Sequence, residues 1–202
     1  MSATGWRDLV VNYIRDAAQP VDKFGHQPRL YALTLELGKN IDYDDDVVFA
    51  AAWMHDLGIF IGHRPEDIQA LAEWNHIQYT IERTQELLPA WGFPGAKLEA
   101  VAEVIKTHQP NERPQTVEGM LVHDADILEQ LGAIAVVRAF AKVGRDTRYR
   151  DFSSVLEVLR KALRDLPDML CLSQSMQLAK PRAASLQEFI AALEFEAGDL
   201  LF

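Results

Sequence analysis

Apolar residues recur along most of the chain at the three- and four-residue spacing that is typical of amphipathic helices. A first helix with Val10 and Ile14 on its buried face is expected to end at Pro20, and a second is expected to start near Lys23. Apolar runs that could form strands are short and ambiguous. Further helices are expected at residues 47–57, 69–88, 96–107, 116–131, 133–143, 153–163 and 186–201. The sequence therefore predicts an all-α fold, a single domain of about nine helices over residues 1–202.

The segment from Val47 to Leu57, VVFAAAWMHDL, is apolar almost all round. A helix with this pattern is expected to be buried at the centre of a domain. Acidic residues at 44–46 suit the positive end of its dipole. Gly58 is well placed to end the helix. The segment is therefore predicted to be the core helix of the bundle.

The formal net charge of −10 restricts the partners that the protein can bind. A general nucleic-acid binder needs a basic surface, so we expect no nucleic-acid polymer as a partner. No apolar run reaches the length of a membrane span, and charged residues near the N-terminus exclude a signal-peptide core there. With a single cysteine, the chain has no intrachain disulfide. These features favour the cytoplasm, whereas the number of copies in an assembly cannot be read from them, and an oligomer stays open.

Two residues that can bind metals, His55 and Asp56, stand side by side at the end of the apolar core segment. A buried aspartate is costly unless it is paired or bound to a metal. The alternative is a capping Asp beside a surface His. His26 and Asp126 add a second imidazole and a second carboxylate, each beside an apolar helical face. Such a set suits a divalent ion such as Mn, Fe, Ni, Co or Mg.

The ordered pattern of His26, His55–Asp56 and Asp126 resembles the HD-domain phosphohydrolase superfamily, and in particular its small bacterial hydrolases. The resemblance includes HxxR at His26–Arg29 and DADxLE at Asp124–Glu129, and it extends to Arg138. It implies a helical HD-domain bundle with a metal-site core at about residues 23–145 and C-terminal helices at 150–202.

The resemblance implies that His26, His55, Asp56 and Asp126 bind one divalent metal ion, which would activate a water for attack on phosphorus. His76 and His108 match histidines that contact substrate phosphates, act as proton donors or bind a second metal in related proteins. We favour substrate contact and catalysis, because the Gly-Tyr-Pro signature of binuclear phosphodiesterases is absent after His108. A second metal is therefore the less favoured alternative.

Positive charge should gather where phosphate groups bind. Arg29 and Lys106 are candidates because they lie near predicted ligands in the sequence, and Arg138 matches an arginine of the family. His63 and His123 are expected at the surface or behind the ligands, and Cys171 is expected in the core.

The predicted function is the metal-dependent hydrolysis of a small phosphorylated substrate, with a nucleotide favoured. Two alternatives remain: an HD-type di-iron oxygenase that uses His76 and His108 for its second iron, and a non-catalytic metal-binding regulatory module. Neither the substrate nor the bond that is cleaved follows from the sequence.

Overall fold

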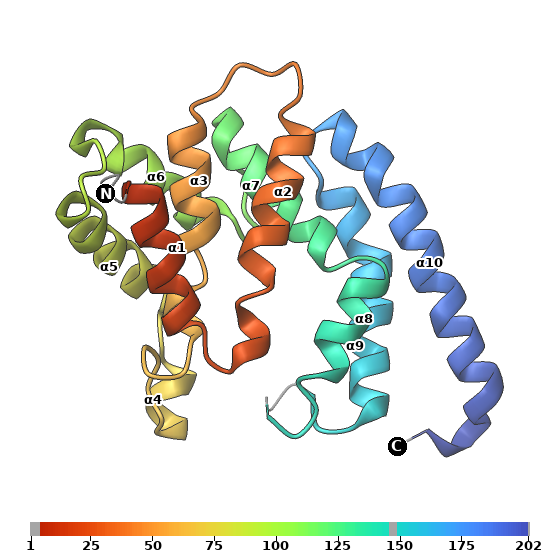
Figure 1. Cartoon of the computed structure of the whole chain (residues 1–202). Coiled ribbons are helices and arrows are strands. Elements are labelled where there is room, and N and C mark those ends of the chain that lie inside the picture. The colour runs from red at the N-terminus through yellow and green to blue at the C-terminus, as the bar shows by residue number, and fades with distance from the viewer. Residues whose placement is uncertain (1–4, 146–148, 202) are drawn as a thin grey trace. The chain divides into compact units, whose positions relative to one another are not determined.

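The computed structural model describes residues 5–145 and 149–201, so residues 146–148 of the loop expected at 144–153 lie outside it. The described residues form ten α-helices joined by short 3-10 turns and no strand, which confirms the predicted all-α fold (Figure 1). The α-helices are α1 (Trp6–Ala17), α2 (His26–Leu37), α3 (Asp45–Met54), α4 (Ile68–Ala72), α5 (His76–Ala90), α6 (Leu98–Thr107), α7 (Val117–Glu129), α8 (Ala133–Phe140), α9 (Phe152–Asp165) and α10 (Ser173–Ala197). The 3-10 turns are η1 (Val21–Lys23), η2 (Leu57–Ile59), η3 (Gly95–Lys97), η4 (Leu166–Met169) and η5 (Gly198–Leu200).

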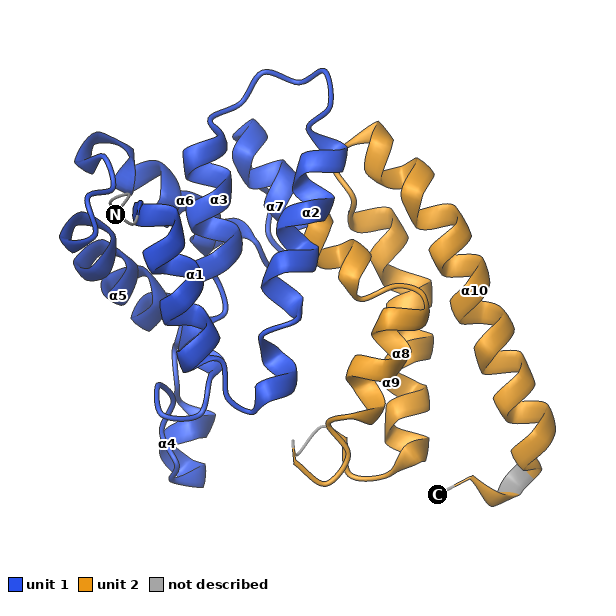
Figure 2. Ribbon diagram, in the orientation of Figure 1, with its two compact units in different colours: residues 1–123 blue, residues 124–202 orange. Residues whose placement is uncertain are grey.

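The chain divides into two units, residues 1–123 and residues 124–202, which are coloured separately in Figure 2. The border falls inside α7, so this one helix begins in unit 1 and ends in unit 2. The predicted limits of a metal-site core at 23–145 and of C-terminal helices at 150–202 stay predictions. No described helix is both long enough and apolar enough to cross a membrane.

Helix α3 is the centre of unit 1, as its apolar pattern predicts. Every residue from Val47 to Met54 is buried, and α1, α2 and α6 pack against it. Its first turn is capped by Asp44, whose carboxylate accepts hydrogen bonds from the backbone N–H groups of Asp46 and Val47. The acidic residues before the helix therefore act at its N-terminus, as expected.

The end of α3 differs from the prediction. The helix ends at Met54, so His55 and Asp56 follow it in a turn instead of forming its last residues. Gly58 does not end the helix but lies in η2, where its N–H donates to Thr80 Oγ1 and its carbonyl accepts from Trp74 Nε1. These contacts come from residues more than fifteen positions away, so no local pattern indicated them.

The helix expected over residues 69–88 is two helices, α4 and α5, separated by residues 73–75. Asn75 starts α5, because its side chain accepts a hydrogen bond from the N–H of Gln78. Trp74, just before this cap, is the residue whose indole contacts Gly58. The break therefore brings the first residue of α5, His76, to the turn that follows the His55–Asp56 pair.

Unit 2 consists of the end of α7 together with α8, α9 and α10, which pack against one another. The last helix was predicted at 186–201, but α10 begins at Ser173 and contains Pro181 in its interior. Its N-cap, Leu172, has no side chain that can cap. The cap comes instead from Asp124 of α7, whose carboxylate accepts hydrogen bonds from the N–H groups of Cys171 and Leu172 at 2.8 to 3.1 Å. Because the capping residue lies far away in the chain, the sequence around Ser173 gives no signal that a helix begins there.

Candidate metal centre

Two histidines from different elements of unit 1 meet in the protein interior. His26 is the first residue of α2, His55 follows α3, and their side chains are 4% and 0% exposed. Their Nε2 atoms lie 3.2 Å apart. Two imidazole nitrogens bound to one ion at about 2.1 Å, at angles between about 90° and about 109°, would lie about 3.0 to 3.4 Å apart. The observed separation therefore fits two ligands of a single ion.

Asp56 adds a carboxylate to the same cluster. Its two oxygens lie 3.6 Å from His55 Nε2 and 3.8 Å from His26 Nε2, and its side chain is 17% exposed. Burial opposes its ionised form, but electrostatic attraction from its neighbours, chiefly the imidazoles of His55 and His26, holds its pKa well below the usual range of a carboxyl group. An ionised oxygen ligand beside two imidazoles suits a divalent cation.

His108, at the C-terminal end of α6, is the fourth member of the cluster in unit 1. It is buried, its ring centroid lies 4.9 Å from that of His55, and its ligand atom lies within 4.8 Å of those of His55 and Asp56. Nδ1 of His108 lies 2.6 Å from the carbonyl oxygen of Ile105, and Nδ1 of His55 lies 3.0 Å from that of Ala52. A proton on each Nδ1 satisfies these carbonyls and leaves Nε2 with its lone pair, the form in which imidazole binds a metal or accepts a proton.

His76 reaches the edge of this cluster through Gln109. Nε2 of His76 lies 3.1 Å from the side-chain nitrogen of Gln109, the residue that follows His108. The start of α5 can approach this closely because residue 58 is a glycine. A Cβ on Gly58 would lie 2.4 Å from the backbone oxygen of His76, far inside van der Waals contact. Both histidines predicted to be catalytic therefore belong to one region of unit 1.

The two predicted substrate-binding cations of unit 1 lie on α2 and α6. Arg29 lies on α2, one turn after His26, and its guanidinium folds back over Gly25, where a Cβ would lie 2.8 Å from its terminal nitrogen. Lys106 lies on α6 with 68% of its side chain exposed, and its Nζ is 3.8 Å from a carboxylate oxygen of Glu103. Both roles stay predictions.

The two aspartates of the DAD triplet differ in their partners within unit 2. Asp124 is fully buried and caps α10, so it has a structural role. Asp126 lies one turn before the end of α7, is partly exposed, and accepts a hydrogen bond from the side-chain amide of Gln130 at 3.1 Å. The prediction that Asp126, and not Asp124, is the ligand is consistent with these partners but is not tested by them.

Arg138, the third predicted substrate-binding residue, pairs with an acidic residue of its own unit. Its guanidinium lies 3.4 Å from a carboxylate oxygen of Glu129 and 3.2 Å from the backbone oxygen of the same residue. Glu129 is only 2% exposed. Arg138 therefore neutralises a buried charge, and its contact with substrate stays a prediction.

For the remaining histidines and the cysteine, the structure excludes a surface position for His123 and a core position for Cys171. His63 is partly buried and lies 2.9 Å from the hydroxyl of Tyr79. His123 was expected at the surface or behind the ligands and is fully buried, with Nε2 3.4 Å from the carbonyl of Pro110. Cys171 was expected in the core but is partly exposed, because it stands at the capped start of α10.

The model of the HD domain matches residues 24–131, more than half of the chain and the stretch from the start of α2 to just beyond α7. This chain belongs to the HD domain family. The match includes His26, His55, Asp56, His108 and Asp126.

Known proteins of similar sequence and fold agree with this assignment. The chain is 25% identical to the uncharacterised protein YpgQ of Bacillus subtilis over 177 residues, which are 84% of this chain and 81% of YpgQ. The crystal structure of YpgQ in complex with ADP has a TM-score of 0.73 with 24% identity and covers 96% of both chains. A predicted HD-superfamily hydrolase from an uncultured Thermotogales bacterium has a TM-score of 0.67 with 22% identity and covers 98% of this chain and 97% of its own. At these identities the two structures support the fold alone.

Sequence reasoning missed three residues of this chain. Lys23 was seen only as the start of a helix, although its charge acts on Asp56. Gln109 was given no role, although it bonds His76. Asp124 was quoted within the DAD pattern without a role of its own. Only the DAD pattern carried a signal, because two carboxylates two positions apart point to different faces of a helix.

Proposed function

We propose that this HD-domain chain is a metal-dependent phosphohydrolase that acts on a nucleotide or a related small phosphorylated compound. The observation that carries the proposal is the pair of Nε2 atoms of His26 and His55, 3.2 Å apart beside the ionised carboxylate of Asp56. We propose Asp126 as the fourth ligand, on the strength of the HD pattern that the family match includes.

Imidazole nitrogens and carboxylates together suit Mn, Fe, Co or Ni, and also Mg, and we propose one such ion per chain. When bound, the ion would lower the pKa of a coordinated water and polarise a phosphoryl oxygen. The chain's own contribution is to fix the ligands: the carbonyl of Ala52 sets the tautomer of His55, and burial holds the His55 ring in place.

His108 and His76 are the proposed proton-transfer residues. Nδ1 of His108 is engaged by the Ile105 carbonyl, so proton exchange takes place at Nε2, on the side of the ring that faces the cluster. The side-chain nitrogen of Gln109 lies 3.1 Å from Nε2 of His76 and fixes the orientation of that ring. Arg29 is the proposed cation for a substrate phosphate, because it lies one turn from His26 on the same helix face.

The nucleotide as substrate is supported by the ADP in the crystals of YpgQ, the relative with 25% identity. Which bond is hydrolysed is left to experiment. The partly exposed side chain of Asp56 is consistent with access for a small molecule from solvent.

The test is a panel of nucleotides with the purified chain and Mn²⁺, Ni²⁺, Co²⁺ or Mg²⁺, with release of phosphate and pyrophosphate as the measurement. We expect turnover with at least one nucleotide and a loss of at least about a thousandfold in Asp56→Ala, because a ligand to the ion is lost. Asp8→Ala, which removes an exposed carboxylate from the first turn of α1, is the matched control and should keep full activity. No turnover with any metal would overturn the proposal, and two irons per chain would favour the oxygenase alternative.

A further inference from the structure

A small cavity lies beside α4 in unit 1, with a volume of about 240 Å³. Its lining consists of Ile61, Gly62, Arg64, Pro65, Glu66 and Leu71. Pockets that hold drug-sized ligands measure about 300 to 1,000 Å³, so this cavity suits a smaller molecule. In Figure 2, α4 lies at the lower end of unit 1, and none of its residues is buried. A ligand can therefore enter the cavity from solvent.

The turn that carries Ile61 and Arg64 forms one wall of the cavity, and hydrogen bonds hold its backbone. The N–H groups of His63 and Arg64 both donate to the carbonyl of Phe60, at 3.0 and 3.1 Å. The N–H group of Ile61 donates to the carbonyl of Gln19 at 3.0 Å. The side chain of Phe60 is fully buried. The turn is therefore fixed in shape and tied to the segment before η1.

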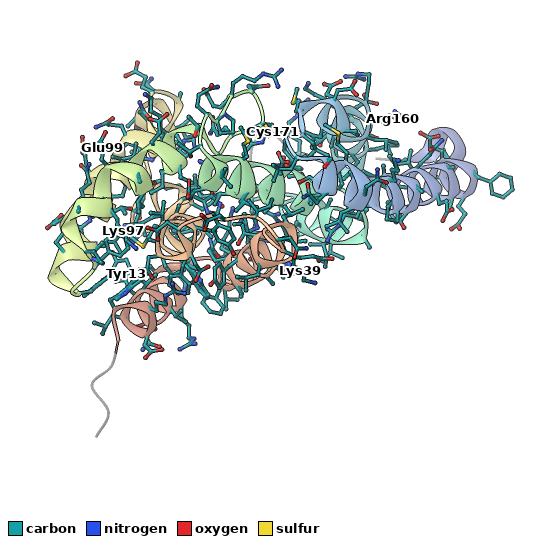
Figure 3. All side chains as sticks on the ribbon, turned by 90° about the horizontal axis from the view of Figure 1, so that it is seen from above. Tyr13, Lys39, Lys97, Glu99, Arg160 and Cys171 are labelled. Carbon is teal, nitrogen blue, oxygen red and sulfur yellow. The ribbon has the colours of Figure 1, made fainter. Side chains whose placement is uncertain are left out.

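His63 anchors the same turn through its side chain. Its Nδ1 lies 2.9 Å from the hydroxyl of Tyr79 on α5. Its ring centroid lies 6.3 Å from that of Tyr13 on α1, which is labelled in Figure 3. Both helices pack into unit 1, α1 against α3 and α5 against α6. Arg64, the next residue in the chain, therefore extends from a base that is fixed before any ligand binds.

Arg64 differs from the other arginines of unit 1 in its surroundings. It is partly buried, and within residues 5–145 and 149–201 its guanidinium forms no hydrogen bond or ion pair. Arg7 and Arg83 form ion pairs with carboxylates, and Arg113 is exposed to solvent. A partly buried cation that lacks a partner costs free energy, which a bound anion offsets. A planar guanidinium binds a carboxylate through two parallel hydrogen bonds.

Glu66 gives the lining of the cavity its negative charge. The residue is exposed, and it forms no ion pair with Arg64. Both charges are therefore accessible to a ligand. They sum to zero, so they complement a molecule that carries one anionic and one cationic group. A phosphate ester, with a charge of about −1.5 to −2 at neutral pH, matches them less well.

We propose that this cavity binds a small zwitterion with an apolar body, of the size of a branched-chain amino acid. Arg64 binds its carboxylate, and Glu66 accepts a hydrogen bond from its ammonium group. Ile61, Pro65 and Leu71 cover its apolar body. Leu71 belongs to α4, so the bound ligand also holds this helix against the turn. The inference does not depend on the proposed function, because no lining residue belongs to the candidate metal centre.

The test measures the binding of L-leucine to the full chain by saturation-transfer NMR, with and without EDTA. We expect a dissociation constant on the order of 1 mM, because so small a ligand makes few contacts. EDTA should leave this value unchanged, since the cavity requires no metal. Arg64→Gln should weaken binding on the order of tenfold, because the paired hydrogen bonds to the carboxylate are lost. Arg64→Lys keeps the charge without the planar group and should bind with intermediate affinity.

Ligands that lack one of the two charges separate the roles of Arg64 and Glu66. Isocaproate has no amino group, so it should bind more weakly than leucine and equally to the wild-type chain and Glu66→Gln. Isoamylamine has no carboxylate, so it should not distinguish the wild-type chain from Arg64→Gln. Leu71→Ala should weaken the binding of all three ligands several-fold, because it removes apolar contact from the far wall.

Arg113→Gln is the matched control, because it removes the same charge from an exposed position outside the cavity, and it should bind leucine like the wild-type chain. A wild-type chain that binds no leucine, or equal binding in Arg64→Gln, would overturn the inference. Loss of binding on addition of EDTA would place leucine at the metal centre and overturn it as well. Isocaproate that binds as tightly as leucine would contradict the zwitterion and the role of Glu66.

Discussion

Unit 1 and unit 2 each contain an aspartate with little exposure, and the two carboxylates differ in their partners. In unit 2, Asp124 accepts hydrogen bonds from the backbone N–H groups of Cys171 and Leu172. In unit 1, Asp56 faces His26 and His55, which are themselves candidate ligands. Backbone donors give the carboxylate of Asp124 a structural role, whereas the imidazole neighbours of Asp56 favour a metal site.

A similar contrast separates Glu129 of unit 2 from the buried histidines His55 and His108 of unit 1. In unit 2, the charge of Glu129 is balanced by Arg138. In unit 1, the Nδ1 atoms of His55 and His108 are engaged by carbonyls of their own helices, while their rings lie against each other. The polar groups of unit 2 described above pair with one another, whereas those of unit 1 gather several groups of the metal-ligand type in one place.

The comparison is tested most strongly by replacing each of the two aspartates in turn, because the two substitutions should have opposite effects on stability and on metal affinity. Asp124→Ala should lower the free energy of unfolding by about 3 kcal/mol, because two backbone N–H groups at the start of α10 lose their acceptor. Urea denaturation of the metal-free chain measures the change. Asp124→Asn keeps one acceptor oxygen and should lose less.

Asp56→Ala should show the opposite pattern, with metal affinity lost and a smaller change in unfolding free energy than in Asp124→Ala. If both variants were destabilised equally, and both still bound Mn²⁺, the distinction between the two units would be wrong.

A second substitution tests how the site of unit 1 is assembled. Gly58→Ala should destabilise the chain by about 2 kcal/mol, because the new methyl group meets the backbone of His76 and α5 must move. The displacement should also reduce turnover, since His76 moves with the start of α5. Thermal denaturation and activity are the measurements. Gly95→Ala is the matched control, because a Cβ there meets no atom within 4 Å; an equal effect at both glycines would contradict the close-packing argument.

The smallest effect is expected from the charged network on the surface of unit 1. The hydrogen bond from Arg7, followed by that from Lys97, lowers the pKa of Asp46 below its usual value. A carboxyl group whose pKa is lower in the folded state contributes stability above its unfolded pKa and loses it as the pH falls through the folded value. Asp46→Asn should therefore cost less than about 1 kcal/mol at pH 7, since the partners are about one-third exposed.

The difference between wild type and Asp46→Asn should shrink as the pH falls from 5 to 3 in urea denaturation series. A difference that grew toward acid pH would have the wrong sign for a lowered pKa. The residues of the candidate metal centre should be unaffected by this variant at neutral pH, which separates the surface network from that cluster.

The sequence by itself determined the elements that depend on neighbouring residues. The all-round apolar pattern of 47–57 predicted the buried core helix, although the helix ends at Met54, and the acidic residues before it predicted where it starts. The order of His26, His55–Asp56 and Asp126 predicted the family, because ligand types and their order are written in the chain. That these residues bind a metal remains a proposal.

Only the tertiary structure decided the features that depend on distant partners. The break before α5 follows from the contact between Trp74 and Gly58, and the early start of α10 follows from the cap that Asp124 provides. The bond between Gln109 and His76 has the same origin, because 33 positions separate the two in the chain. Hydrophobic periodicity reports which face of a segment is buried but not what it is buried against, so partners across the fold are invisible to it.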